Sequence, residues 1–468
     1  MRLPLDPEHL SGELGGLSEL GEFDGLTDEV MDFSSRGIRP GLTRVSRLLR
    51  VLGSPEEGIR AIHVLGTNGK GSTAATMEAI LRASGMRTAL YTSPHLVSLQ
   101  ERLRIDGGYL PIATWRNAWS RVRLAVESDA ELSADRPSFF ENFTALSLLM
   151  ASESSMDAAV IEAGMGGRYD ATSVCRPSAT LINPIGMDHM EYLGPTIEAI
   201  AGEKFAAVKS GVDAFYSADD EPLARLFTSV CRECGAPCHL LDAMASPFDV
   251  RTSLDGTSFS YRSISAGEMT DLRTPLIGFH QAQNATRAIT TLLELAGKNP
   301  AFSGVGEAAV RSGLAATDWP GRMEVVRRHS GSMLMLDGAH NEHGASALVS
   351  SLSELRDDTA SERRIEVGGV IFAVMRDKDA EPILRRIAAI GCPVYCTSPP
   401  MERALPASEL AGLARSIGIE VGGAFPDPSD ALDSASHDAG SKLVVCCGSL
   451  FLVGHMRKVL MRSDFCAK

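Results

Sequence analysis

The stretch "AIHVLGTNGKGSTAATMEAIL", residues 61–81, decides the fold of this chain. An apolar, β-branched segment runs into three glycines and a lysine, and a helix-favouring run follows. A buried strand, a glycine-rich turn and a helix in that order present backbone N–H groups to phosphate oxygens. We therefore predict that the turn binds phosphate and that the strand lies in an α/β sheet.

The spelling of this turn departs from the common phosphate loop. Gly66 and Gly69 let the backbone approach an anion, Lys70 supplies positive charge, and one of the two hydroxyls that follow can hold Mg²⁺. The common loop reads G-x-x-x-x-G-K-[ST], whereas Gly71 separates Lys70 from Ser72 here. A glycine turn without a ligand is the alternative, and the flanking strand and helix favour a phosphate loop.

Length and charge exclude several classes of protein. A chain of 468 residues predicts two or three domains. It has no apolar run of about 18 residues, and its start lacks the pattern of a signal peptide, so we expect a cytoplasmic protein without a membrane partner. A net charge of −14 disfavours binding to nucleic acid, and with it a helicase or other motor.

The nine cysteines include one cluster, "CRECGAPCH", with Cys231, Cys234, Cys238 and His239. A structural zinc site needs four convergent ligands, and no second pair at metal spacing follows this cluster. We therefore predict reduced thiols on a helix end and on the strand after it.

Strand-like and helical patterns alternate along most of the chain, which predicts a largely parallel α/β sheet. Residues 248–263 alternate around Asp-Gly and predict a β-hairpin. The pattern pauses at Trp-Pro-Gly, and a second α/β series follows. We predict a first domain over residues 1–317, a linker over 318–322 and a second domain over 323–468.

Acidic and histidine residues follow two of the predicted strands, where an open α/β sheet places its ligands. Glu162 ends one strand, and Asp188 and His189 follow the next. With Ser72, Glu162 and His189 form a first shell suited to Mg²⁺, although a strand-end acid can also cap a helix and a histidine can be a core residue. The "GMGG" turn does not match G-x-G-x-x-G, which disfavours a nicotinamide dehydrogenase.

Together these motifs resemble the Mur ligase superfamily, and within it folylpolyglutamate synthase and the bifunctional dihydrofolate synthase. "GTNGKGS", residues 66–72, is similar to the phosphate loop of that family. The resemblance spans roughly residues 35–460 and includes, in family order, "YTSPHLVSLQERLRIDG", "SFFENFTAL", "VIEAGMGGRYDAT", "GMDHMEYLGPTIEAIAGEK", "GFHQAQNA", "WPGRMEV", "LDGAHN", "RDKD" and "GSLFLVG".

The resemblance implies an N-terminal P-loop-type ATPase domain with a mostly parallel sheet and a C-terminal Rossmann-like α/β domain that ligates glutamate. Such a monomeric ligase uses ATP to phosphorylate a carboxylate, and the amine of L-glutamate then attacks the acyl phosphate. The implied acceptors are dihydropteroate, reduced folates or both. A related ligase for another carboxylate and an ATP-hydrolysing regulatory protein are the alternatives, and the intact set of Lys70, Glu162, His189 and Lys204 disfavours the second.

The resemblance also implies an ATP and metal site. The phosphate loop would be formed by Gly66, Thr67, Asn68, Gly69, Lys70, Gly71 and Ser72. Contacts to the nucleoside are implied for Asn284, Asp337 and His340, and contacts to the phosphates for Arg322. Lys70, His189 and Lys204 would be catalytic, and two Mg²⁺ ions are implied, one of them near a carbamate on Lys204.

The acceptor pocket is implied by two further segments. Ser93, Pro94, His95 and Arg102 lie in the first, and Phe140, Asp170 and Ala171 match the dihydropteroate pocket of bifunctional members. An aromatic ring for stacking and a carboxylate for N–H groups suit a pterin. The chain departs from the family pattern at Tyr169, Ser173, Pro184 and Glu342, and we expect the acceptor to touch the pocket between Tyr169 and Ser173.

Overall fold

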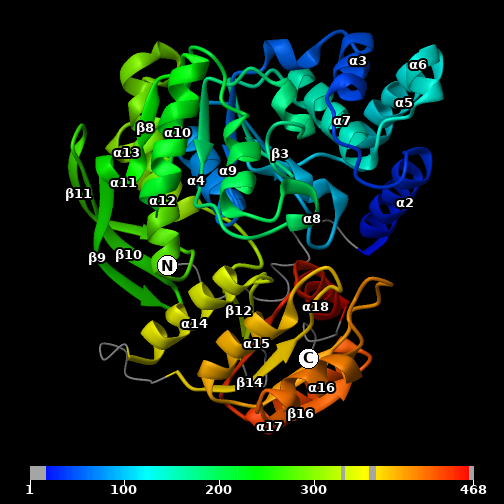
Figure 1. Cartoon of the computed structure of the whole chain (residues 1–468), viewed down its shortest axis with the longest axis vertical. Helices are drawn as coiled ribbons and strands as arrows, with labels where there is room; N and C mark the ends of the chain where they lie inside the picture. Colours follow the sequence, from blue (N-terminus) through cyan, green and yellow to red (C-terminus); the bar gives the residue numbers. More distant parts are fainter. Residues whose placement is uncertain (1–16, 219, 328–332, 358–364, 463–468) are drawn as a thin grey trace.

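The structure is a computed structural model, and it describes residues 17–218, 220–327, 333–357 and 365–462. Residues 1–16, where we looked for a signal peptide, and residues 463–468 of the predicted second domain lie outside the described part. Figure 1 shows two α/β units, the N-terminal one in blue to green and the C-terminal one in yellow to red, with α18 at their boundary.

The N-terminal unit is built on an eight-stranded sheet in the order β4-β3-β2-β5-β1-β6-β7-β8. All pairs from β2 to β8 are parallel, and β3 and β4 add an antiparallel edge. Its strands are β1 (Ala61–Leu65), β2 (Thr88–Tyr91), β3 (Leu103–Ile105), β4 (Gly108–Tyr109), β5 (Ala158–Glu162), β6 (Ala179–Ile182), β7 (Asp213–Tyr216) and β8 (Cys238–Leu240).

Helices cover both faces of this sheet because its central strands are mostly apolar, and every residue of β1 and β5 is buried. The helices are α2 (Leu17–Phe33), α3 (Thr43–Val51), α4 (Lys70–Ala83), α5 (Ile112–Ser128), α6 (Ala130–Ala134), α7 (Phe139–Glu153), α8 (Met190–Leu193), α9 (Ile197–Phe205), α10 (Glu221–Cys234), α11 (Leu241–Met244), α12 (Phe279–Lys298) and α13 (Glu307–Ala316). The predicted strand, glycine turn and helix over residues 61–81 are confirmed as β1 and α4.

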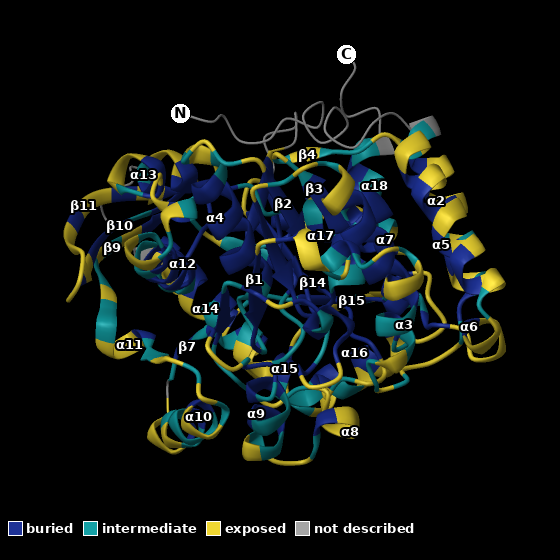
Figure 2. Cartoon of the chain, turned by 90° about the horizontal axis from the view of Figure 1, so that it is seen from above, coloured by how far each residue is buried: buried dark blue, intermediate teal, exposed yellow. Residues whose placement is uncertain are grey.

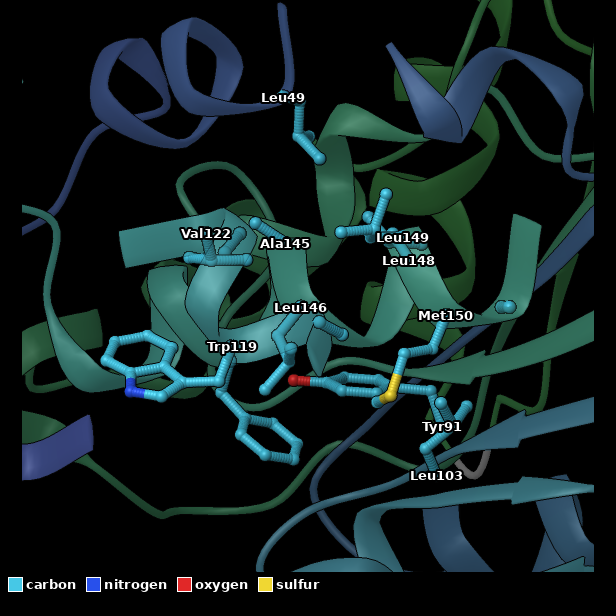
Figure 3. Packing of buried hydrophobic residues seen from close by; sticks show 14 of the residues in the cluster. Leu49, Tyr91, Leu103, Trp119, Val122, Ala145, Leu146, Leu148, Leu149 and Met150 are labelled. Carbon is cyan, nitrogen blue, oxygen red and sulfur yellow. The ribbon is translucent and has the colours of Figure 1, made fainter. Parts of the chain in front are cut away.

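One face of the sheet packs against an aromatic-rich cluster beneath α5 and α7. Trp115 and Phe143 stack with ring centroids 5.6 Å apart, and Tyr91 stacks on Phe143 at 6.3 Å. Figure 3 shows Tyr91, Leu146 and Trp119 within this cluster. The tyrosine hydroxyl is satisfied by the hydroxyl of Thr144 at 3.0 Å. This cluster fixes the end of β2, from which the "TSPH" segment leads toward the site.

A separate antiparallel sheet in the order β11-β10-β9 follows the large one. Its strands are β9 (Ala245–Ser253), β10 (Gly256–Ser263) and β11 (Gly267–Thr274), so the predicted hairpin is confirmed. The sequence did not predict β11. Its pairing with β10 shifts register between Phe259 and Tyr261, and this irregularity interrupts the two-residue alternation that identifies a strand.

The C-terminal unit contains a six-stranded sheet in the order β12-β13-β17-β14-β15-β16, parallel except for β12 at one edge. The strands are β12 (Glu324–Arg327), β13 (Met333–Leu336), β14 (Val367–Phe372), β15 (Val394–Thr397), β16 (Val421–Phe425) and β17 (Leu443–Cys447). The helices are α14 (Glu342–Asp357), α15 (Ala380–Ile387), α16 (Ala407–Ser416), α17 (Pro428–Ala439) and α18 (Leu450–Arg462). The predicted two-unit α/β fold is confirmed.

The two units touch closely where α18 meets the loop after β2. A Cβ added at Gly454 would lie 2.0 Å from the carbonyl oxygen of Leu96, so only glycine fits there. Farther out, Thr252 donates a hydrogen bond to Glu354 at 3.0 Å. Figure 2 shows buried residues gathered around β1 and β14 and exposed residues on the outer faces of helices such as α5. No helix in the described ranges is long and apolar enough to cross a bilayer.

The predicted placement of the clustered cysteines on a helix end and the following strand is confirmed. Cys231 and Cys234 lie in the last turns of α10, Cys238 begins β8, and all of the described cysteines are free. His239 is paired with Asp213 at 2.6 Å. The described residues contain no cluster of three or more His, Cys, Asp or Glu side chains suited to a metal.

We predict that Gly313→Ala destabilises the protein. An added Cβ would lie 2.4 Å from the Cα of Ile80 and 2.6 Å from its backbone nitrogen, so α13 would have to move away from α4. Overpacking of this kind costs about 1–3 kcal/mol. The matched control is Gly297→Ala in α12, which has open space and should gain up to about 1 kcal/mol. Thermal unfolding midpoints of both variants test this, and equal midpoints would contradict it.

Candidate active site

A cavity of about 1280 Å³ lies between the two units and takes its walls from both. It lies at the carboxyl ends of β1, β5 and β6, where an open parallel sheet binds its ligands. Most of the predicted site residues line it. Among the described residues Gly66, His95 and Lys204 are the predicted ones that do not.

The phosphate loop faces this cavity with the N-terminus of α4. Gly66 and Gly69 both have positive φ, 133° and 80°. A Cβ added at Gly66 would lie 2.7 Å from the Cβ of Asn183, and one at Gly69 would lie 2.6 Å from Oδ1 of Asn284. Glycine is thus required at both positions by conformation and by space. The free N–H groups of the first turn of α4 then form an anion site.

Lys70 adds a movable positive charge to this anion site. Its ammonium donates hydrogen bonds to the carbonyl oxygens of Gly66 at 3.2 Å and Thr67 at 3.1 Å, and its side chain lines the cavity. The loop also contacts the second unit, because Asn341 donates to Oδ1 of Asn68 at 3.2 Å. The phosphate loop therefore lies where the two units meet.

Ser72, Glu162 and His189 line the same cavity, as the sequence predicted for a metal site. Burial raises the pKa of Glu162, whereas Lys70, the Ser93 N–H and Arg322 oppose this rise. Burial lowers the pKa of His189 to about 4, so its imidazole is neutral at pH 7 and offers a lone pair. One carboxylate, one imidazole and one hydroxyl suit Mg²⁺, which takes its remaining ligands from phosphate and water.

The linker and the second unit contribute opposite charges to the cavity, from Arg322 and Asp337. Asp337 accepts hydrogen bonds from the N–H groups of Met323 at 2.9 Å and Ala339 at 2.8 Å. Burial raises the pKa of Asp337 and lowers that of Arg322, and in each case the opposite charge of the other opposes the change. Arg322 is half-buried on the cavity wall, where its guanidinium also donates a hydrogen bond to the carbonyl oxygen of Gly321 at 2.9 Å.

His340 lies beside this pair, with Nδ1 2.7 Å from the carbonyl oxygen of Gly338. A carbonyl only accepts, so Nδ1 carries the proton and Nε2 is left with a lone pair. Asn284, also predicted to contact the nucleoside, lines the cavity beside Gly69 and accepts a hydrogen bond from Arg287 at 2.9 Å.

Lys204 lies beneath the phosphate loop and not on the helix surface. Its side chain is buried, and Nζ donates to the carbonyl oxygen of Gly66 at 2.9 Å. Burial, helped by the charge of Lys70, lowers the pKa of Lys204 to about 7. This burial excludes the other role that a lysine on this helix could have, an ion pair on the protein surface. A pKa of about 7 leaves a sizeable fraction of the amine neutral at physiological pH.

An aromatic wall stands at the other end of the cavity. A Cβ at Gly164 would lie 2.5 Å from Cζ of Phe140, so the ring lies directly on the glycine backbone. The guanidinium of Arg102 lies 5.4 and 5.3 Å from the centroids of Phe139 and Phe143. Arg102 also donates to Nδ1 of His95 at 3.0 Å.

Of the residues that the resemblance implied for the acceptor pocket, His95 is the one that does not line the cavity. It lies behind Arg102 instead of on the cavity wall, and burial lowers its pKa to about 3. A neutral imidazole is the form that can accept the hydrogen bond from Arg102. His95 therefore orients Arg102, which itself lines the cavity.

Family models match both units of the chain. The Mur ligase middle domain matches residues 64–292, and the Mur ligase, glutamate ligase domain matches residues 321–450. A dihydrofolate synthase/folylpolyglutamate synthase of Bacillus subtilis is 33% identical, over 91% of this chain and 96% of its own length. The chain belongs to the folylpolyglutamate synthase and dihydrofolate synthase family of Mur ligases.

Solved structures of this family have the same fold. A Mycobacterium tuberculosis folylpolyglutamate synthase complexed with ADP superposes with a TM-score of 0.83 at 31% identity, covering 96% of this chain and 99% of that one. Escherichia coli FolC in complex with DHPP and ADP superposes with a TM-score of 0.80 at 27% identity, covering 94% and 97%.

Two of the departures from the family pattern face the cavity and two do not. Tyr169 lines it with 54% of its surface exposed, and Pro184 lines it while its carbonyl accepts the N–H of Thr67 at 3.0 Å. Ser173 is buried, donates to the carbonyl oxygen of Gly167 and does not line the cavity. Glu342 is paired with Arg386 on the surface.

Sequence reasoning missed several residues of the cavity. Met31, Ile38 and Tyr192 join Tyr169 in lining it although each is roughly half exposed, and these four form an apolar rim beside the exposed lining residues Asp32 and Arg36. An exposed apolar rim is typical of a site that binds an aromatic or aliphatic group. Residues 17–59 carried no motif that we recognised, so the sequence offered no signal for the first two.

The second unit also contributes cations that we had not assigned. Lys378, within the quoted "RDKD" motif, and Arg403 both line the cavity. Lys378 pairs with Asp188 across the boundary at 2.5 Å. Burial opposes ionisation of Asp188, but His189 and Lys378 prevail and lower its pKa to about 2, so the pair stays charged. The motif was a usable signal for Lys378.

Asp170 lines the cavity, but its carboxylate is already engaged within its own loop. One oxygen accepts from the backbone N–H and the hydroxyl of Thr172, and the other accepts from the N–H of Met165 at 2.8 Å. We therefore predict that Asp170→Ala lowers the free energy of unfolding by about 3 kcal/mol, because three hydrogen bonds of about 1 kcal/mol each are lost.

Chemical unfolding and steady-state kinetics together test this role of Asp170. Asp170→Asn is the matched control, because it keeps one acceptor oxygen and should lose less stability. If Asp170→Ala unfolds like the wild type but fails to use a pteroate, then the carboxylate contacts the acceptor directly and does not brace the loop.

Proposed function

We propose that this protein is an ATP-dependent ligase that adds L-glutamate to dihydropteroate, to reduced folates or to both. The observation that carries the proposal is one cavity that joins a phosphate loop, buried charged groups from both units and an aromatic wall. The family membership and the ADP-bound relatives support it. The apolar rim supports an acceptor with a flat aromatic part.

In the proposed reaction the acceptor carboxylate attacks the γ-phosphorus of ATP and ADP leaves. The amine of glutamate then attacks the acyl carbon, and phosphate leaves. Lys70 and the first turn of α4 would hold the β- and γ-phosphates, and Arg322 would offset the charge that moves between the two substrates. In this proposal Lys378 and Arg403, which line the cavity, would bind the carboxylates of glutamate.

Ser72, Glu162 and His189 would hold one Mg²⁺, which when bound neutralises phosphate charge. In this proposal residues 66–72, Asn284, Arg322, Asp337 and His340 bind ATP. Ser93, Pro94, Arg102, Phe140 and Ala171 would contact the acceptor, with His95 behind them and Asp170 bracing the loop.

We further propose that residues 1–317 form the ATP-binding domain, 318–322 the linker and 323–468 the glutamate-ligating domain. The positions of α13 and β12 on either side of the linker support these boundaries. We propose a monomer in the cytoplasm that binds neither nucleic acid nor membrane, which the negative charge and the free described thiols support.

The product test separates this function from its alternatives. The protein is incubated with ATP, Mg²⁺ and glutamate, together with dihydropteroate or tetrahydrofolate, and product masses and ADP are measured. We expect ADP release to require both glutamate and a pteroate, and Lys70→Ala to lower the rate at least about 100-fold without unfolding. ADP release without either acceptor would indicate a regulatory ATPase, and a product with another carboxylate alone would indicate a different ligase.

We propose in addition that Lys204 is carbamylated and helps to hold a second Mg²⁺. Its neutral amine would attack CO₂ and release one proton, and the carbamate nitrogen would keep an N–H for the carbonyl oxygen of Gly66. Burial supports the modification because it lowers the pKa of Lys204 to about 7, whereas an ordinary lysine near 10.4 stays protonated.

We predict that ¹³C-bicarbonate gives a carbamate signal in the NMR spectrum of the wild type and none in Lys204→Ala. The signal should strengthen as pH rises through 7, since deprotonation of the amine precedes the addition of CO₂. Lys204→Ala should still bind ATP but lose most of its ligase activity, and short carboxylates should restore part of it. A fully active Lys204→Ala, or a wild type without the signal, would contradict the proposal.

A further inference from the structure

Gly71, the residue that separates Lys70 from Ser72, lies against the indole of Trp319 in the linker. A Cβ added at Gly71 would lie 2.4 Å from Cζ2 and 2.8 Å from Cε2 of the indole, closer than real Cβ atoms approach. Gly71 is in α4 and does not have a positive φ, so its backbone conformation does not require glycine. Glycine is required at this position because Trp319 occupies the space that a Cβ would need.

The indole of Trp319 is also contacted by Arg104 from β3. Its guanidinium lies 5.4 Å from the centroid of the Trp319 ring, and Nη2 donates to the carbonyl oxygen of Asp318 at 3.2 Å. The same guanidinium pairs with the carboxylate of Asp318 at 3.5 Å. The buried indole N–H finds no hydrogen-bond acceptor among the described residues. Packing between Gly71 and Arg104 therefore fixes the ring.

The linker is equally constrained between Trp319 and Arg322. The N–H of Gly321 donates to Glu324 at 2.9 Å, and a Cβ at Gly321 would lie 2.9 Å from Leu96 and 3.0 Å from Val453. The next residue is Arg322, whose side chain enters the cavity. A short segment held by these contacts thus connects the indole beside the phosphate loop to the guanidinium on the cavity wall.

We propose that Trp319 is a positioning residue that fixes Arg322 relative to the phosphate loop, and that Gly71 is the seat for its ring. Trp319 does not line the cavity, so it acts through Arg322 and not on a substrate. The role of Arg322 in catalysis rests on the proposed function, whereas the contact between Gly71 and Trp319 does not. The seat explains why a glycine interrupts the common phosphate-loop spelling.

A double-mutant cycle tests this coupling. Gly71→Ala, Trp319→Ala and the double variant are compared for ADP binding by calorimetry and for ligation rate, with Gly297→Ala as an uncrowded helical control. We expect Gly71→Ala to weaken ADP binding about tenfold and removal of the indole to restore it to within about threefold, because coupled residues are not additive. If the double variant instead loses ADP affinity by the product of the two single losses, the proposal is overturned. Gly71 would then be needed only so that the backbone can approach the phosphate.

Measurements of kcat test whether Trp319 acts on the reaction through Arg322. Trp319→Ala should lower kcat about tenfold with little change in ADP affinity, and it should add little in an Arg322→Ala background. Trp319→Phe should keep kcat within about threefold, because a phenyl ring fills part of the same seat. An additive loss in the Arg322→Ala background, or a Phe variant as slow as the Ala variant, would overturn the proposal.

Fluorescence gives a readout that does not depend on ligation or on the folding of the alanine variants. Trp115 and Trp119 are buried in the cluster beneath α5 and α7, so the nucleotide-dependent emission should come from Trp319 and vanish in Trp319→Phe. An unchanged signal in Trp319→Phe contradicts the proposal. If the wild type makes no glutamyl product, the proposed function is refuted. The double-mutant cycle on ADP binding still decides whether Gly71 and Trp319 are coupled.

Discussion

The arrangement of this molecule depends on the close approach of three side chains to the phosphate loop. Gly66 faces Asn183, Gly69 faces Asn284 and Gly71 faces Trp319, each at a distance that leaves no room for a Cβ. These three neighbours come from the end of β6, from α12 and from the linker. The loop is therefore a junction for segments that are far apart in the sequence, and its glycines serve the packing of the protein as well as a ligand.

Several positively charged side chains lie around this junction, and opposite charges offset the cost of burying them. The chain carries a net charge of −14, yet Lys70, Arg322 and Lys378 gather around the cavity. Arg322 and Asp337 each stabilise the charged form of the other against the cost of burial. An anionic substrate would thus meet preorganised positive charge, and the two units would be drawn together by the same groups that contact it.

Some local patterns predicted the structure well and others did not, for identifiable reasons. The strands that end at Glu162 and before His189 were predictable because buried parallel strands are continuously apolar. β16 was missed because Gly422 and Gly423 interrupt an apolar segment, and both lie against aromatic rings where no side chain fits. Asp170 was recognised as a site residue, but its hydrogen bonds to its own loop depend on a turn that the sequence pattern did not specify.

The sequence by itself determined the local structure: the strand, glycine turn and helix of the phosphate loop, and the acidic and histidine residues that follow β5 and β6. These features follow from residues that are neighbours in the chain. Their periodicity and conformational preferences can be recognised from the sequence before the tertiary structure is known. Only the tertiary structure decided that Lys204 is buried, that His95 stands behind Arg102 and that Trp319 fills the space beside Gly71. Burial and steric exclusion arise between distant segments, so no local pattern encodes them.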